Sequence, residues 1–177
     1  MALAINATVG ASDANSCCTL AEAEAFHESR LHNAAWTAAT EPTKIAALVW
    51  AARLLDTQIL WEGIPTDCER QALQWPRIGM YGPASDTVYD AIGKPIADNE
   101  IPKQLKDAQA ELAMYLITAD TTAEVSSEGI GNLEVGTIKI GFNGQSVRRP
   151  IPNSVWEMIS LWGSRMTGGA TVKLVRS

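Results

Sequence analysis

The chain has 177 residues, of which 46% are hydrophobic, and its formal net charge at neutral pH is −6. A chain of this length can form one domain with its own core, without metal or disulfide support. Its apolar runs stop short of the roughly 20 residues that a membrane span needs, and no basic residue opens the amino terminus as in a secretory signal. We therefore expect a protein that is made in the cytoplasm and does not enter a membrane.

Charge is divided unevenly along the chain. Residues 1–138 carry a net charge of −11, whereas residues 139–177 carry +5. An acidic body with a basic end differs from a duplex-DNA-binding protein, which concentrates basic side chains on one surface. The pattern favours docking of the basic end on an acidic protein.

Cysteines and histidines give little sign of a metal or disulfide site. Cys17 and Cys18 are adjacent and no Cys-x-x-Cys spacing occurs, so the three cysteines predict reduced thiols. His27 and His32 are five residues apart and do not share a helix face, which makes a metal site with these cysteines the weaker interpretation. Phosphate-binding loops, hydrolase elbows and His-Glu-x-x-His motifs are absent from the sequence. We expect no catalytic site, no cofactor and no metal.

The first part of the chain predicts a short strand and two helices. Alternating apolar residues from Leu3 to Val9 favour the strand. Thr19-Leu-Ala-Glu22 has the form of a capping box, which predicts a helix to about Leu31. A stripe of apolar residues at steps of three and four predicts a second helix between Pro42 and Gly63. The stripe consists of Ile45, Leu48, Val49, Ala52, Leu55 and Ile59.

Residues 76–100 are rich in proline and glycine and predict a long loop. Loops of this length inside a compact domain are usually functional or are ordered by a partner. Pro102 suits the first turn of a helix, and the apolar spacing that follows predicts a third helix of about 18 residues. We expect the second and third helices to pack together.

The last third of the chain changes from helical to strand periodicity. Alternation and turn signals at Gly136-Thr137 and Asn143-Gly144 predict a meander of strands at 130–135, 138–142 and 145–149. A final helix capped by Asn153 or Ser154 and an alternating tail at 171–176 follow. The predicted fold is mainly α: a small antiparallel bundle of three to four helices with a C-terminal β-meander or hairpin and extended termini. Its parts are a helical body at 1–120, the β segment at 121–150, and a helix with a tail at 151–177.

Six tryptophans stand out in the composition. Large aromatic side chains serve both cores and protein interfaces, and for Trp50 and Trp61, in or beside the second helix, burial is the favoured interpretation. Trp75 is extended because it precedes Pro76, and it stands just before Arg77. Two alternatives remain for Trp75: the ring fills the helical core while Arg77 pairs with an acid, or the ring is presented to a neighbouring subunit.

A set of segments occurs in a fixed order between residues 14 and 116. It comprises Ala14-Asn15-Ser16, residues 19–26, Ala35-Trp36, residues 44–56, Trp61-Glu62-Gly63, Gln71-x-Leu-x-Trp-Pro-Arg77 and residues 101–113. As a set, these segments resemble the head-to-tail adaptor proteins of tailed bacteriophages. Many members of that family carry an older label as single-stranded-DNA-binding proteins similar to a primosome component.

The resemblance implies a ring of twelve subunits at the virion neck. The ring would bind the portal protein on one side and a stopper or tail-completion protein on the other. Genomic DNA would pass through its channel without sequence-specific binding, since an acidic lining repels phosphates. In this picture the subunit interface contains Trp75, Pro76, Arg77 and Tyr81. Portal docking would use the basic tail, with Arg165, Lys173, Leu174, Val175 and Arg176.

The alternative function is that of a replication-associated single-stranded-DNA-binding protein. Such a protein needs a basic groove lined with aromatic side chains on which bases stack. The tryptophans would supply the stacking surfaces, but the acidic body argues against the groove.

Overall fold

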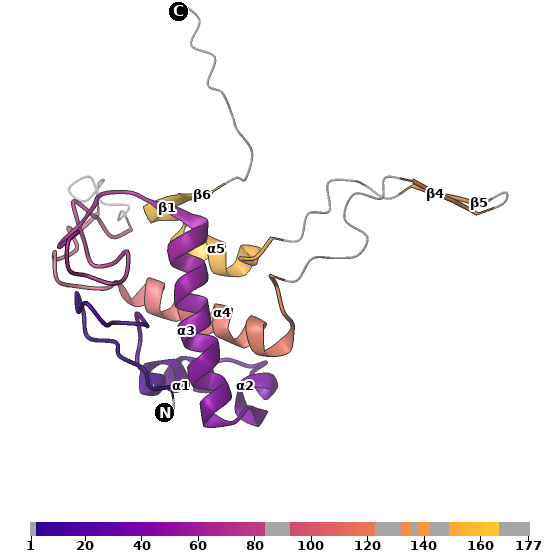
Figure 1. The fold of residues 1–177 in the computed structure, drawn as a ribbon, viewed down its shortest axis with the longest axis horizontal. Coiled ribbons are helices and arrows are strands. Elements are labelled where there is room, and N and C mark those ends of the chain that lie inside the picture. The colour runs from indigo at the N-terminus through magenta and orange to yellow at the C-terminus, as the bar shows by residue number, and fades with distance from the viewer. Residues whose placement is uncertain (1–2, 84–92, 123–131, 136–137, 142–148, 167–177) are drawn as a thin grey trace, which may run out of the picture.

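Helix α4 (Lys103–Thr118) is the centre of the helical body, and the other helices pack around it. The computed structural model describes residues 3–83, 93–122, 132–135, 138–141 and 149–166. Helix α3 (Glu41–Gln58) crosses α4, with α1 (Leu20–Glu28) and α2 (Ala34–Ala38) near its start (Figure 1). Helix α5 (Asn153–Ile159) packs on α4 and continues into a 3₁₀ turn at Ser160–Trp162.

The described strands form three antiparallel pairs. Strand β1 (Ile59–Trp61) pairs with β6 (Gly163–Arg165), and β2 (Ile64–Pro65) pairs with β3 (Arg77–Ile78). Strand β4 (Asn132–Val135) pairs with β5 (Ile138–Gly141). The structure confirms the predicted class, which is mainly α with a C-terminal hairpin.

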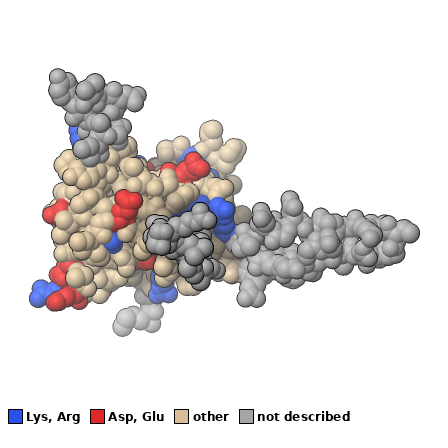
Figure 2. Space-filling view, turned by 90° about the horizontal axis from the view of Figure 1, so that it is seen from above, with Lys and Arg blue, Asp and Glu red and all other residues tan. Residues whose placement is uncertain are grey.

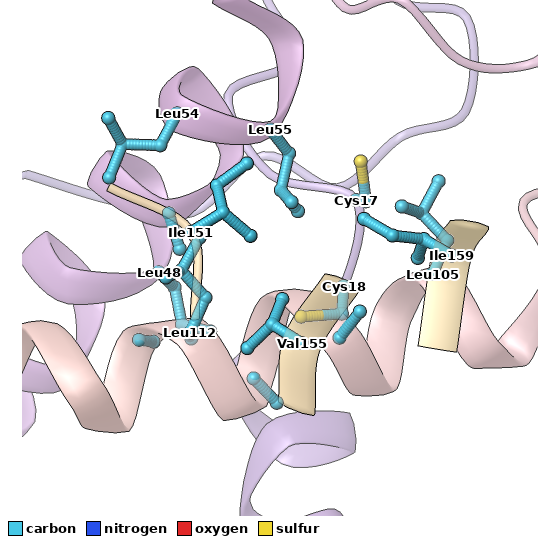
Figure 3. Packing of buried hydrophobic residues seen from close by; sticks show 14 of the residues in the cluster. Cys17, Cys18, Leu48, Leu54, Leu55, Leu105, Leu112, Ile151, Val155 and Ile159 are labelled. Atoms are coloured by element: carbon cyan, nitrogen blue, oxygen red, sulfur yellow. The ribbon is translucent and has the colours of Figure 1, made fainter. Parts of the chain in front are cut away.

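The core lies where α3 and α4 cross. Leucines of α3 and α4 face one another there, and residues 151–159 and the two adjacent cysteines close the cluster (Figure 3). The labelled members are Cys17, Cys18, Leu48, Leu54, Leu55, Leu105, Leu112, Ile151, Val155 and Ile159. The predicted packing of the second helix on the third is therefore confirmed.

A buried glutamine ties three segments of this core together. Gln109 of α4 is completely buried, and its Oε1 accepts a hydrogen bond of 2.8 Å from the amide of Cys17. Its Nε2 donates to Ser16 Oγ at 2.7 Å and to the carbonyl of Leu48 at 2.9 Å. The segment before α1 is thus fixed to both α3 and α4 by one side chain, because buried backbone groups need partners.

The start of the chain confirms one prediction and corrects another. Thr19 and Glu22 form the predicted capping box, and α1 begins at Leu20. The strand predicted at residues 3–9 is wrong, since residues 3–8 are neither strand nor helix. The Asn15 side chain accepts from the amide of Asn6 at 2.8 Å and donates to the carbonyl of Ala4 at 2.9 Å. It occupies backbone groups that a partner strand would need.

The second helix ends at Gln58, earlier than the predicted limit at Gly63. Ile59 has an extended backbone and begins β1, whose partner β6 lies about a hundred residues later in the chain. A side chain at Gly163 would meet the Leu60 carbonyl oxygen at 2.8 Å, so the two strands approach this closely only with glycine there. The sequence near Ile59 contains no pattern that indicates a strand partner so far along the chain.

The C-terminal predictions are confirmed in part. Strands β4 and β5 match the first two predicted strands, whereas most of the third, at 145–149, and the tail at 171–176 lie outside the described residues. The predicted cap of the last helix is wrong, because Pro152 precedes its first residue and no side chain caps it. The Asn153 side chain instead accepts a 3.0 Å hydrogen bond from Arg165.

Replacing Gln109 tests the tie between the amino-terminal segment and the core. Gln109→Leu keeps the volume but leaves the buried amide of Cys17 without its acceptor and removes the donor to Ser16 and Leu48, so we expect the free energy of unfolding to fall by about 3 kcal/mol. Gln104→Leu, on the exposed side of the same helix, is the control and should change it by less than about 0.5 kcal/mol. Chemical denaturation followed by circular dichroism measures both. Equal losses in the two variants would contradict this role of Gln109.

Candidate interaction surface

Trp75 lies inside the body between two other tryptophans. Its side chain is 1% exposed, and its ring meets Trp61 of β1 edge-on at 5.7 Å between centroids. On its other side it meets Trp162 of the 3₁₀ turn at 5.8 Å, again edge-on. Edge-to-face packing is a favourable arrangement for aromatic rings. Of the two alternatives for Trp75, the structure shows the core position.

Arg77 binds backbone carbonyls. Its guanidinium donates to the carbonyls of Glu62 at 2.6 Å, Gly63 at 2.8 Å and Gln74 at 2.9 Å, and the residue is 5% exposed. Burial lowers the pKa of Arg77, while the charge of Asp56 raises it. The predicted pairing of Arg77 with an acid is therefore found only as the effect of the Asp56 charge on the pKa of Arg77. Arg77 holds the β1–β2 turn against the segment that carries Trp75.

Three of the four residues predicted at a subunit interface are internal. Pro76 is buried like Trp75 and Arg77, and the Trp75–Pro76 peptide bond is cis. Their side chains offer no surface to a neighbouring subunit, so any effect on assembly passes through the fold. Tyr81 is 46% exposed, and its carbonyl accepts a 2.6 Å hydrogen bond from the Trp162 indole. For Tyr81 the interface role stays a prediction.

Arg165, predicted to dock on the portal, is engaged within the body. Its guanidinium lies 4.8 Å from the centre of the Trp156 ring and donates to Asn153 Oδ1 at 3.0 Å. Burial lowers its pKa, nearby Arg149 acts in the same direction, and Glu157 opposes them. Arg165 therefore fastens β6 to α5. The other docking residues, Lys173, Leu174, Val175 and Arg176, lie outside the described residues.

Exposed aliphatic side chains gather on and beside the short strands. Ile64 and Ile78 are directly opposite each other in the β2–β3 pair and are 66% and 43% exposed. Leu60, Leu161 and Met166 are more than half exposed on or next to β1, the 3₁₀ turn and β6. On the end of the molecule seen in Figure 2, uncharged side chains form most of the described surface, with acidic and basic groups interspersed. Strands of two or three residues have no measurable periodicity, so sequence reasoning missed these side chains.

A second exposed surface lies on α3. Trp61 is buried as predicted, but Trp50 is 43% exposed, which corrects its predicted burial. Trp50 points away from the stripe that packs on α4, and Ala46, Arg53 and Thr57 share its helix face. We call these four residues the Trp50 face.

A hollow of about 400 Å³ adjoins the Trp50 face. Arg53, Asp56 and Thr57 of α3 form one wall, and residues 14–15 and 72–74 form the others. Asp56 accepts a 3.2 Å hydrogen bond from the amide of Gln74. Burial raises the pKa of Asp56 to about 6, against the lowering influence of the Gln74 amide and Arg77. Asp56 thus links the segment that carries Trp75 to α3, although burial of its carboxyl group disfavours the charged form.

Another cavity of about 440 Å³ lies between α1 and the start of α4. Four of the five charged groups that line it are paired within the protein, since Lys106 pairs with Glu22 at 2.7 Å and Lys103 with Asp107 at 2.5 Å; the fifth is Glu100. It therefore gives less indication of a ligand than the surfaces above.

Neither a membrane helix nor a metal cluster is found in the part of the chain that the structure describes. None of its helices is both long enough and apolar enough to cross a bilayer. The described histidines, cysteines and acids nowhere form a group of three or more with the spacing of metal ligands.

The family comparison covers the whole chain. The model of the family described as "Putative DnaT-like ssDNA binding protein" matches residues 1–177. Comparison with curated proteins found no match, and neither did comparison with solved structures.

Replacing Arg77 tests its role as a backbone clamp. Arg77→Met retains much of the side-chain volume but removes the donors to Glu62, Gly63 and Gln74, so we expect a loss of about 3 kcal/mol in the free energy of unfolding. Arg70→Met, at an exposed position of the same loop, should cost less than about 0.5 kcal/mol. Urea unfolding followed by tryptophan fluorescence measures both. A stable Arg77→Met protein would show that the carbonyls do not depend on this side chain.

The raised pKa of Asp56 predicts that the stability of the fold depends on pH. Its pKa of about 6 in the folded protein lies above the ordinary value of 3.8, so the folded state binds the proton more tightly than the unfolded state does. The contribution of Asp56 to the free energy of unfolding therefore falls as the pH rises from about 4 to about 6. Asp56→Asn removes that dependence. Relative to the wild type, the variant should gain about 2 kcal/mol between pH 4 and pH 7.5. Asp98→Asn, at an exposed carboxylate, is the control; equal pH profiles for Asp56→Asn and the wild type would contradict the assignment.

Proposed function

The chain belongs to this DnaT-like family, and we propose that its function is structural: it is a head-to-tail adaptor at the neck of a tailed-bacteriophage virion. In this role copies of the chain form a ring between the portal protein and a stopper or tail-completion protein. DNA passes through the ring without being held. The proposal assigns the chain no catalytic step.

The distribution of apolar side chains carries this proposal. Single-stranded nucleic acid is bound by stacking its bases on exposed aromatic rings. Four of the six tryptophans are buried, and these are Trp36, Trp61, Trp75 and Trp162. The exposed apolar surface is instead largely aliphatic, as on the β1–β6 and β2–β3 pairs, and such patches on a folded body favour protein docking.

The charges of the body support the same role. Four basic side chains are paired with acids in the described structure: Arg30 with Glu111, Lys44 with Glu24, Lys103 with Asp107 and Lys106 with Glu22. A cation that is already paired contributes less to phosphate binding, which depends on the release of counterions from the nucleic acid. Together with the charge of −11 on residues 1–138, this favours a surface that lets DNA slide past.

The segments that resemble head-to-tail adaptors lie in the framework of the body. Thr19 caps α1, the Trp36 ring stacks on His27 at 4.2 Å, Trp75 packs on Trp61 of β1, and Arg77 donates to the Glu62 carbonyl. The resemblance thus rests on residues that set the fold. Under the proposal, the docking surfaces are the exposed side chains that this framework positions.

Single-stranded-DNA binding is the second candidate, and the description of the matching family favours it. The exposed rings available to it in the described chain are Trp50 and Tyr81, with Trp156 half-buried beneath Arg165. A binding protein of this kind would need a basic path that joins them.

A titration at two salt concentrations separates the candidates. Fluorescence anisotropy of labelled oligo(dT) with the full chain at 50 and 200 mM salt should show little binding at either concentration if the chain is an adaptor. Contact with about four phosphates would give a log–log salt slope of about −3. That slope, with binding in the micromolar range or tighter, would support the second candidate and contradict the first.

Assembly on the portal supplies the complementary measurement. We expect the full chain to co-sediment with rings of the portal protein encoded in the same genome, and truncation after residue 166 to abolish this while the body stays folded by circular dichroism. Retained co-sedimentation of the truncated chain would remove the basic tail from portal docking. Failure of the full chain to co-sediment would contradict the adaptor role.

A further inference from the structure

A ring imposes a requirement on the surface of each subunit. Its contacts are heterologous, so one surface must meet a different surface on the next copy. Two of the exposed surfaces in the described part of the chain differ in chemistry and lie on separate elements: the Trp50 face of α3, which joins a tryptophan to an arginine, and the aliphatic Ile64 with Ile78 on the β2–β3 pair. We call the latter the isoleucine pair.

The Trp50 face combines a large exposed aromatic side chain with a single basic group. Tryptophan and arginine are the residue types most enriched among interface residues that dominate binding energy. Arg53 is exposed and forms no ion pair among the described residues. Its neighbours Ala46 and Thr57 are small and uncharged, and the hollow of about 400 Å³ opens beside it. Trp50 is the large apolar side chain exposed on the outer side of α3, where the positions around it are small or polar.

The isoleucine pair has the opposite charge around it. Directly opposite residues of an antiparallel pair project to the same side, so Ile64 and Ile78 form one aliphatic ridge. The exposed segment 62–70 that contains Ile64 carries three acids and one base, so its net charge is acidic, and none of these groups forms an ion pair in the described part of the chain; they are Glu62, Asp67, Glu69 and Arg70. The ridge is thus apolar, with unpaired acidic groups nearby.

We propose that the isoleucine pair of one copy docks on the Trp50 face of the next copy. This inference rests on the proposed ring and names the two surfaces that build it. The aliphatic side chains pack against the Trp50 ring and the adjoining hollow, while Arg53 meets Glu62 or Glu69. Apolar burial supplies the contact area, and the opposite charges fix its orientation.

Charge also disfavours the symmetric alternatives. Two Trp50 faces placed together would bring two Arg53 side chains into one interface. Two isoleucine pairs placed together would oppose the carboxylates of Glu62 and Glu69. Like charges juxtaposed at an interface cost several kcal/mol. The mixed contact avoids both and can propagate from copy to copy.

Cross-linking tests which surfaces meet. Cys68 is exposed and follows Ile64 by four residues, whereas Cys17 and Cys18 are buried. Ala46→Cys adds a second accessible thiol on the Trp50 face. A short bismaleimide added to the assembled full chain should then give a ladder of dimers, trimers and larger species on a denaturing gel.

The controls for this ladder are matched variants. Ala38→Cys places the added thiol on an exposed position of α2 and should give no ladder beyond that of the wild type. Ala46→Cys combined with Cys68→Ser should lose the ladder. Dimers alone, or equal ladders from Ala38→Cys and Ala46→Cys, would overturn the proposed contact.

Charge exchange gives a second, independent test. Arg53→Glu should weaken assembly of the folded chain at least about tenfold in sedimentation velocity, as expected for reversing one charge at an interface. Adding Glu62→Lys and Glu69→Lys to the same chain should restore it, because the reversed charges again attract. If the wild type assembles but neither the cross-linked ladder nor the charge rescue occurs, the proposed contact between these two surfaces is wrong, and the proposed ring is not contradicted. If the wild type fails to assemble alone or on the portal, the proposed function itself fails.

Discussion

The packing of Trp75 between Trp61 and Trp162 is the contact on which the arrangement of the loops depends. The three rings come from the segment before β3, from β1 and from the turn before β6, so the contact joins regions separated by up to about a hundred residues. Arg77 completes it by donating to carbonyls on both sides of the resulting junction. This junction adds to the contacts of Arg165 with α5 in holding the β1–β6 pair against the helical body.

This constraint explains why the most recognisable segment of the sequence is internal. A rigid junction at the end of α3 holds the short strands in place, and their outward side chains are then free to form contacts. Ile64 and Ile78 are positioned in this way, because Pro65 and Arg77 pair beside them in the same ribbon. The Trp-Pro-Arg segment therefore fixes the surface without being part of it.

The long helices and the capping box were predictable because they are local. Thr19 and Glu22 satisfy each other within one turn, and the apolar spacing of α3 and α4 repeats over several turns. The ends of these elements were less predictable. Ile59 continues the helical spacing of α3, yet it becomes strand because β6 pairs with it. That pairing depends on Gly163, far along the chain, where a side chain would collide with the Leu60 carbonyl.

The candidate surface was the hardest part to predict, and the reason is also physical. A tryptophan serves equally well inside and outside, so composition did not distinguish exposed Trp50 from buried Trp75. Arg77 and Arg165 are basic in the sequence, but in the fold both donate hydrogen bonds to groups of the same chain. The exposed isoleucines belong to strands of two residues, which are too short to produce a periodic pattern in the sequence. Side-chain exposure, available only from the three-dimensional arrangement, separates framework from docking surface.

In the proposed assembly, copies of this chain build a closed ring in which two different surfaces meet. Cryo-electron microscopy of the full chain bound to portal rings tests it most directly. We expect a closed ring with a central channel, in which Trp50 of each copy lies against Ile64 and Ile78 of its neighbour. Isolated copies spaced along a DNA strand, or a ring whose subunits meet through two identical surfaces, would contradict it.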